Sequence, residues 1–162
     1  MMMFLLGESF SQDQTASTKG KIFVSSVNLY YEVLGSGITN SANLEVRFGK
    51  KETGFGVRAG FGYFYVDNAS YSTIPFALNF VAGKDRNKIE LGIGATLYYF
   101  SSDEFIFDAQ DNQTYSFIIM YRYEPEKSGV LIRAGFTPML GKINGGIAFL
   151  PYIPGISIGY KF

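Results

Sequence analysis

The chain has 162 residues, which is enough for one domain whose core needs no disulfide or metal. Lys+Arg and Asp+Glu are both 14, so the net charge is zero, and this argues against an electrostatic nucleic-acid binder. Cys and His are both 0, which excludes thiolate nucleophiles, Ser-His catalysis and metal sites built on either residue.

The first residues differ in character from the rest of the chain. Residues 1–6 form an apolar run, and small and polar residues follow at 9–20. The run lacks a basic segment and is shorter than the roughly 7–15 apolar residues of a signal-peptide core. We expect residues 1–20 to be the remnant of a secretory signal or a disordered tail, and residues 21–162 to be the folded domain. No stretch approaches the roughly 20 apolar residues of a membrane helix.

From Lys21 onward the hydrophobic period is two, which predicts strands, and 19 glycines with 17% aromatic residues also favour β structure. In residues 53–66, aliphatic and aromatic side chains alternate with glycines and Arg58. Residues 88–99 repeat this design with Glu90 and two glycines on the polar face. The alternation predicts eight strands, at 28–34, 43–48, 53–66, 74–82, 88–99, 115–123, 130–140 and 156–162.

The connections between these strands alternate in length. Tight, charged turns follow the second, fourth and sixth strands, whereas longer loops follow the fifth and seventh, at about 101–114 and 141–152. This alternation predicts an all-β fold, an eight-stranded antiparallel up-and-down β-barrel with short turns at one end and longer loops at the other.

Two kinds of barrel share this pattern and differ in the face that points inward. A soluble lipocalin-like barrel would enclose a lipid with the aliphatic face, whereas a transmembrane barrel would turn that face outward. Glycine on the polar face suits the narrow lumen of eight strands, and charges of both signs on that face can pair there. The sequence therefore favours the membrane barrel. The expected lumen charge network is Glu32, Glu45, Arg47, Arg58, Glu90, Arg122, Arg133 and Lys161, and the expected aromatic girdle is Tyr63, Tyr65, Tyr99, Tyr121 and Tyr123.

The polar residues suggest little other chemistry. Because eight strands leave room only for side chains, we expect the network to close the lumen, with a narrow channel or transport accessory as an alternative. The loop carboxylates Asp67, Asp103, Glu104, Asp108 and Asp111, against Lys142, match no calcium loop, so we expect a solvated acidic loop, no metal and no cofactor. No carboxylate base lies beside an obvious Ser nucleophile, so no enzyme is expected. The apolar segment 145–150 is expected to pack into the barrel mouth or contact a partner.

The last strand, with Ile156, Ile158, Tyr160 and the C-terminal Phe162, resembles the terminal signal of bacterial outer-membrane proteins, which the barrel-assembly machinery reads. A closer resemblance, over about 27–162, is to a group of small outer-membrane barrels of the Bacteroidetes type. Segments 44–48, 56–63, 74–80, 89–96, 121–125, 132–138 and 151–162 carry it. The resemblance implies a barrel in the bacterial outer membrane and no agreed activity. We therefore expect a monomer in contact with outer-membrane lipids, with both termini on the periplasmic side and a structural or surface-interaction role.

Overall fold

The computed structural model of the protein describes residues 23–162 except 50, 52, 67–68, 101–111 and 144. The predicted leader at 1–20 and the loop carboxylates Asp67, Asp103, Glu104, Asp108 and Asp111 lie outside the described residues. The elements are β1 (Val24–Leu34), η1 (Gly35–Gly37), β2 (Asn40–Phe48), β3 (Gly54–Val66), β4 (Ala69–Lys84), β5 (Asn87–Phe100), β6 (Gln113–Tyr123), β7 (Gly129–Phe136), β8 (Met139–Ile143), β9 (Gly146–Leu150) and β10 (Pro154–Lys161). In this part of the chain, no helix is long and apolar enough to cross a membrane.

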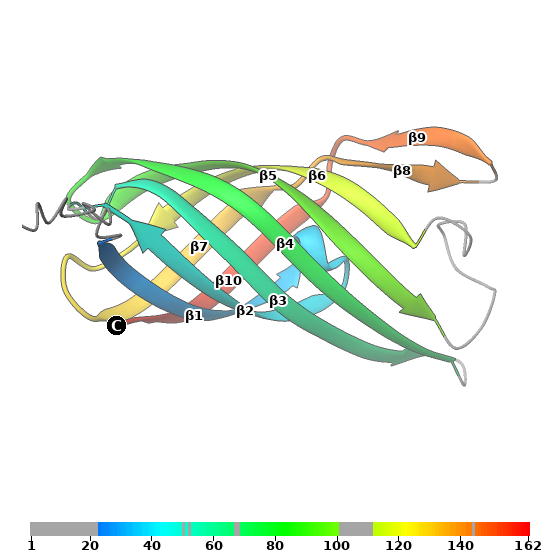
Figure 1. Ribbon diagram of the computed structural model, residues 1–162, viewed down its shortest axis with the longest axis horizontal. Coiled ribbons are helices and arrows are strands. Elements are labelled where there is room, and N and C mark those ends of the chain that lie inside the picture. Colours follow the sequence, from blue (N-terminus) through cyan, green and yellow to red (C-terminus); the bar gives the residue numbers. More distant parts are fainter. Residues whose placement is uncertain (1–22, 50, 52, 67–68, 101–111, 144) are drawn as a thin grey trace, which may run out of the picture.

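Eight of these strands close into one antiparallel barrel, which confirms the predicted fold class (Figure 1). Around the barrel the order is β1, β2, β3, β4, β5, β6, β7 and β10, and β10 pairs with β1 to close the ring. Each barrel strand overlaps one predicted strand. The alternation of apolar and polar residues located these strands, because residues that face outward and inward must alternate along a barrel wall. The tight turns and the C-terminus lie at one end, here called the turn end, and η1 and the longer connections lie toward the other, the loop end.

The wall is not equally tall all round. β3, β4 and β5 extend farther toward the loop end than β1 and β2 (Figure 1). The stretch between the strands predicted at 53–66 and 74–82 is mostly strand in its described residues, since pairing of β3 with β4 continues to Val66 and Ala69. Phe64 stacks on Tyr71 across this extension, with ring centroids 4.7 Å apart. This stacked pair stabilises the continued pairing of β3 and β4, which the polar residues in this stretch of the sequence did not predict.

The stretch after β7 corrects two predictions. The predicted strand 130–140 is interrupted after Phe136, because Pro138 has no backbone N–H to continue the ladder. The predicted loop 141–152 is instead the β8–β9 hairpin, which projects past the barrel at the loop end (Figure 1). Gly145, with φ 76°, adopts the left-handed conformation that this tight turn requires.

The hairpin also overturns the expectation that residues 145–150 pack into the barrel mouth. Ile147 is 83% exposed and Phe149 is 54% exposed, so both side chains point away from the lumen. Met139 on β8 is the buried residue of this region, and it packs on the inner face.

Candidate functional site

The lumen of the barrel contains the polar faces of the strands. All eight residues of the predicted charge network are at most 3% exposed: Glu32, Glu45, Arg47, Arg58, Glu90, Arg122, Arg133 and Lys161. Aliphatic and aromatic residues between them along each strand point outward. The predicted girdle residues Tyr63, Tyr65, Tyr99, Tyr121 and Tyr123 are exposed on the outer wall, as are Ile156, Ile158, Tyr160 and Phe162 at the C-terminus. This polarity is the reverse of what a lipid-filled lumen requires.

Arg122 on β6 makes the largest set of ion pairs in the lumen. Its Nη2 lies 2.8 Å from Glu45 Oε1, its Nη1 lies 2.9 Å from Glu90 Oε2, and its Nε lies 2.5 Å from Glu124 Oε2. Glu45 on β2 also pairs with Arg47 of the same strand. Arg122 therefore connects β2 and β5, two strands that are not neighbours in the wall.

A second group of charges lies next to the first. Arg133 on β7 places Nη2 2.8 Å from Glu90 Oε1 and Nη1 3.8 Å from Glu32 Oε1. Its guanidinium carbon lies 4.4 Å from the ring centroid of Tyr30, a cation–π contact. Arg58 on β3 reaches Glu32 Oε2 at 3.3 Å. Glu90 and Glu32 thus extend the network continuously from β5 to β1.

Two asparagines that were not among the predicted site residues hold the carboxylates in place. Asn79 Nδ2 donates to Glu45 Oε2 and to Glu90 Oε1, both at 2.9 Å, and so joins the two carboxylates. Asn28 Nδ2 donates to Glu45 Oε1 at 3.0 Å. Alternation places both asparagines on the inner face, but no feature of the sequence separates them from other lumen-facing polar residues.

The turn end is closed by a cluster that the predicted network only partly contains. Glu124 Oε1 lies 3.2 Å from Lys161 Nζ and 3.5 Å from Lys88 Nζ. Lys161 Nζ also donates to the backbone oxygens of Pro125 at 2.9 Å and Glu126 at 3.2 Å, in the turn after β6. Glu124 lies two positions after the inward-facing Arg122, and Lys88 lies two positions before the inward-facing Glu90. Alternation therefore places both side chains on the inner face, and this is the signal that could have identified them.

Glu124 lies in a turn outside the strands and is fully buried. Burial alone would raise the pKa of its carboxyl group. Attraction to Arg122, Arg47, Lys88 and Lys161 outweighs burial and lowers this pKa below its usual value. The four cations therefore keep the Glu124 carboxylate ionised.

The connection between β1 and β2 fills the lumen from the other side. All of η1, Gly35–Gly37, is buried inside the barrel. Thr96 Oγ1 on β5 donates to the backbone oxygen of Ser36 at 2.7 Å, and Arg58 donates to the Ser36 hydroxyl. The sequence did not predict this inward fold, because three small residues carry no hydrophobic pattern.

Together these groups cross the lumen at successive levels, from Glu124 at the turn end to η1 near the mouth. Six cations face four carboxylates among the described lumen residues: Arg47, Arg58, Lys88, Arg122, Arg133 and Lys161 against Glu32, Glu45, Glu90 and Glu124. Within the described ranges, no group of three or more His, Cys, Asp or Glu residues could hold a metal ion. The arrangement fits structural pairing of charges across the lumen.

Comparisons of the chain with protein-family models, curated proteins and solved structures find no match. The functional assignment therefore depends on the geometry of the barrel.

Proposed function

We propose that this protein is an integral outer-membrane β-barrel of a bacterium, with a closed lumen and a structural or surface-interaction role. One observation carries the proposal. Large apolar side chains are exposed on the outward face of every barrel strand, while the Glu, Arg and Lys side chains of the strand interiors are buried in the lumen. Water is a poor solvent for such a wall, and hydrocarbon is a good one.

The apolar band also has a suitable height. On β3 the outward aromatic residues extend from Phe55 near the turn end to Tyr65 near the loop end, and both are about 60% exposed. Ten residues at about 3.3 Å each, tilted by about 40°, cover roughly 25 Å along the barrel axis. Outer-membrane barrels carry an apolar band of about this height between two aromatic girdles.

The alternatives have less support. A soluble lipid-binding barrel would need an apolar lumen, and here the lumen holds ten charged side chains. A narrow channel would need a continuous wet path, whereas the Arg122 ion pairs and the buried η1 lie across the lumen. The proposal includes no catalytic role and no nucleic-acid partner.

The last strand suggests how the barrel is assembled. Ile156, Ile158 and Tyr160 form the outward face of β10, the strand that pairs with β1 and closes the ring. An exposed apolar face on the closing strand suits recognition by the barrel-assembly machinery before closure. We propose a monomer that contacts outer-membrane lipids, in keeping with its resemblance to small Bacteroidetes-type barrels.

The proposal is tested by location and by mobility on a gel. The chain is expressed behind an intact bacterial signal peptide, and outer membranes are isolated and compared boiled and unboiled. We expect the chain in that fraction, with an unboiled form that migrates differently from the boiled form. A chain that stays soluble without detergent and shows no shift contradicts the proposal.

A depth series separates lipid contact from water contact on the same wall. Ile119 lies midway between Tyr115 and Tyr123 on β6 and is 51% exposed. In lipid vesicles Ile119→Arg should cost about 2–4 kcal/mol of folding free energy, because arginine is most costly at the bilayer centre. The control Tyr63→Arg, at the girdle level, should cost only about 0–1 kcal/mol. Equal and small effects at both depths would indicate a wall that faces water.

A further inference from the structure

A hollow of about 400 Å³ lies on the outer wall at the turn end, across β4, β5 and β6. Ala82, Ile89 and Tyr121 line it and are in register on the three strands, so their exposed side chains form one outward row. Ala82 is the small member of this row, and Gly83, which follows it, also lines the hollow. A small side chain beside bulky neighbours therefore leaves space at the edge of the apolar wall.

Two cations at the β4–β5 turn lie next to this hollow. Lys84 lies two positions after Ala82, on the same outward face, and is in register with Asn87, which lines the hollow. Arg86 Nη1 donates to the Tyr123 hydroxyl on β6 at 3.3 Å. Ammonium, guanidinium and amide donors at one level of the wall match the oxygens of a phosphate group.

The charges of Lys84 and Arg86 are not taken up by carboxylates of the chain. With respect to the described residues, the Lys84 side chain makes no hydrogen bond or ion pair, and the Arg86 side chain makes only its bond to Tyr123. The exposed Asp85 between them pairs with neither, and Glu126 in the next turn attracts Arg86 without forming an ion pair. Both cations therefore remain able to bind an anion from outside the chain.

The two ends of the barrel differ in charge. The described turns at the turn end carry more exposed cations than exposed carboxylates: Lys51, Lys84, Arg86 and Lys127 against Asp85 and Glu126. Residues 50 and 52 of the same end, which lie outside the described residues, add one charge of each sign to the sequence. The sequence of the loop-end connections has Asp67, Asp103, Glu104, Asp108 and Asp111 against Lys142. An anionic ligand therefore suits the turn end better than the loop end.

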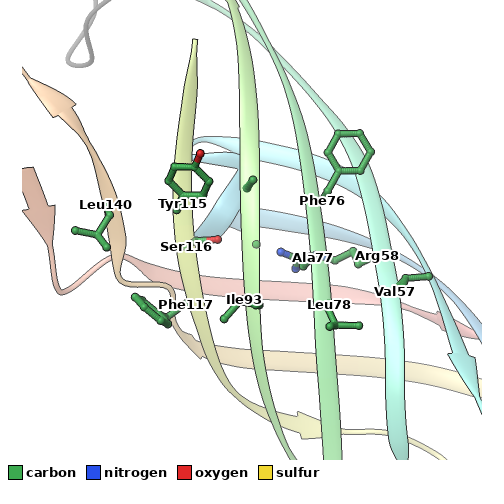
Figure 2. Close-up of a pocket in the computed structure, with 12 residues that line it drawn as sticks. Val57, Arg58, Phe76, Ala77, Leu78, Ile93, Tyr115, Ser116, Phe117 and Leu140 are labelled. Carbon is green, nitrogen blue, oxygen red and sulfur yellow. The ribbon is translucent and has the colours of Figure 1, made fainter. Parts of the chain in front are cut away.

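A larger hollow of about 610 Å³ on the same wall lacks this chemistry. It lies farther along the same strands, and in Figure 2 the rings of Phe76 and Tyr115 lie on either side of β5. Its outward side chains are aliphatic or aromatic, whereas Arg58 and Ser116, which also line it, are buried on the lumen side. This hollow can accept hydrocarbon, but it offers no cation to a headgroup.

We propose that the turn-end hollow binds one membrane lipid with an anionic phosphate headgroup, its phosphate between Lys84 and Arg86 and the start of an acyl chain over Ala82. This inference rests on the proposed membrane location. The exposed Tyr121 and Tyr123 mark the level of the wall at which the aromatic girdles of outer-membrane barrels lie, where hydrocarbon meets headgroups. A lipid supplies both the phosphate and the hydrocarbon at this level in one molecule.

A second copy of the chain suits the hollow less well. A copy beside the first in the same membrane would bring its own turn end to this level, with the same excess of exposed cations over carboxylates. The outward faces of the described barrel strands carry no Asp or Glu that could approach Lys84 or Arg86 instead. Two copies therefore repel each other at the position where a lipid phosphate is attracted.

The test uses the full chain folded into vesicles that contain equal amounts of phosphatidylglycerol and phosphatidylcholine. Native mass spectrometry then measures the fraction of barrels that retain a lipid and the ratio of the two lipids retained. We expect wild type to favour phosphatidylglycerol by about fivefold, the effect of one net charge at a membrane surface, since Asp85 offsets one of the two cations. Lys84→Gln and Arg86→Gln should each remove most of this preference. The control Lys51→Gln makes the same change of charge in the β2–β3 turn, outside the hollow, and should keep it.

A second pair of variants tests the acyl-chain position. Ala82→Leu fills the hollow beside Ile89 and Tyr121 and should lower retention of both lipids severalfold. Ala134→Leu makes the same change at an exposed position of β7, outside the hollow, and should leave retention unchanged. The boiled-versus-unboiled mobility shift shows that each variant is folded.

The outcomes distinguish this inference from the proposed function. A barrel that inserts without a headgroup preference, or whose preference falls equally in Lys84→Gln and Lys51→Gln, overturns the lipid site and leaves the membrane location intact. Dimers that carry no lipid overturn it in favour of a second copy. Equal loss of retention in Ala82→Leu and Ala134→Leu overturns the acyl-chain position. A wild-type chain that fails to insert into vesicles overturns the proposed function, and the lipid site with it.

Discussion

Removing Arg122 should destabilise the barrel far more than removing Arg47, although both arginines are fully buried in the lumen. Arg122 pairs with Glu45, Glu90 and Glu124. Arg47 makes a direct ion pair with Glu45 alone among the described residues, although it also attracts Glu124, and its Nε and Nη1 are buried without a hydrogen-bond partner. The substitutions Arg122→Met and Arg47→Met remove the same charge and keep much of the side-chain volume.

The expected magnitudes follow from the groups left behind. Without Arg122, three buried carboxylates each lose a charged partner, and breaking a buried ion pair from one side costs about 3–5 kcal/mol. Glu45 keeps Arg47 and Asn79 in that variant, and this places the cost within that range instead of above it. Without Arg47, Glu45 still has Arg122, and two unpaired donors disappear whose burial costs about 1–3 kcal/mol each. This gain, about 2–6 kcal/mol in total, is offset by the lost ion pair with Glu45, which costs about 3–5 kcal/mol when broken from one side. Because the two effects are similar in size and opposite in sign, Arg47→Met should change stability by about 1 kcal/mol or less.

The measurement is urea unfolding of the barrel in detergent micelles. The folded fraction is followed by circular dichroism and by the mobility of unboiled samples, since the chain has no Trp to report by fluorescence. Both variants should keep the wild-type dependence of unfolding free energy on urea. Equal destabilisation by Arg122→Met and Arg47→Met would refute the reasoning, because it would mean that the number of ion pairs does not determine the cost.

Three further predictions follow from the same structure. Gly159→Ala should cost about 1–3 kcal/mol and lower the folded yield, because its Cβ would overlap the backbone of β1 at the barrel seam. Gly146→Ala, whose Cβ would come no nearer than 3.7 Å to any atom, should be neutral in the same unfolding assay. The pKa of Glu124 is lower in the folded state than in the unfolded state, so its stabilising effect is present above its ordinary pKa and is lost as the pH falls through the folded value. Glu124→Gln should therefore weaken the loss of stability on acidification, measured as unfolding midpoints at pH 7 and pH 4. In planar bilayers, the wild-type barrel should show no steady ion conductance, and an open-channel current would contradict a closed lumen.

The barrel was predictable because each strand must separate two environments. Alternation of period two along residues 53–66 and 88–99 placed glycines and charges on one face and apolar residues on the other. That pattern was enough to assign Arg58 and Glu90 to the lumen, where the structure has them. The number of strands followed from repetition of the same pattern along the chain.

The pairing within the lumen was not predictable from that pattern. Arg122 reaches Glu45 from 77 positions away, and which inward residues share a level depends on the stagger of the closed barrel. The inward fold of η1 and the β8–β9 hairpin were missed for a different reason. The small residues of η1 carry no hydrophobic period. Residues 146–150 contain no polar side chain, so they show no alternation by which a strand could be recognised.

The buried charges act together to fix the register of the barrel. Arg133 on β7 pairs with Glu90 on β5 and Glu32 on β1, so these contacts connect strands that are not neighbours in the wall. A one-residue slip of any barrel strand except β4, which has no buried charge, would turn lumen charges toward the apolar outside, at a cost of several kcal/mol for each unpaired ion. An all-apolar lumen could be more stable once folded, but it would no longer disfavour barrels whose strands are shifted in register. In the membrane location proposed above, the chain crosses water before insertion, and an all-apolar lumen would raise its mean hydropathy, now +0.09. The Glu and Arg residues of the lumen are therefore explained by assembly as much as by the stability of the final barrel.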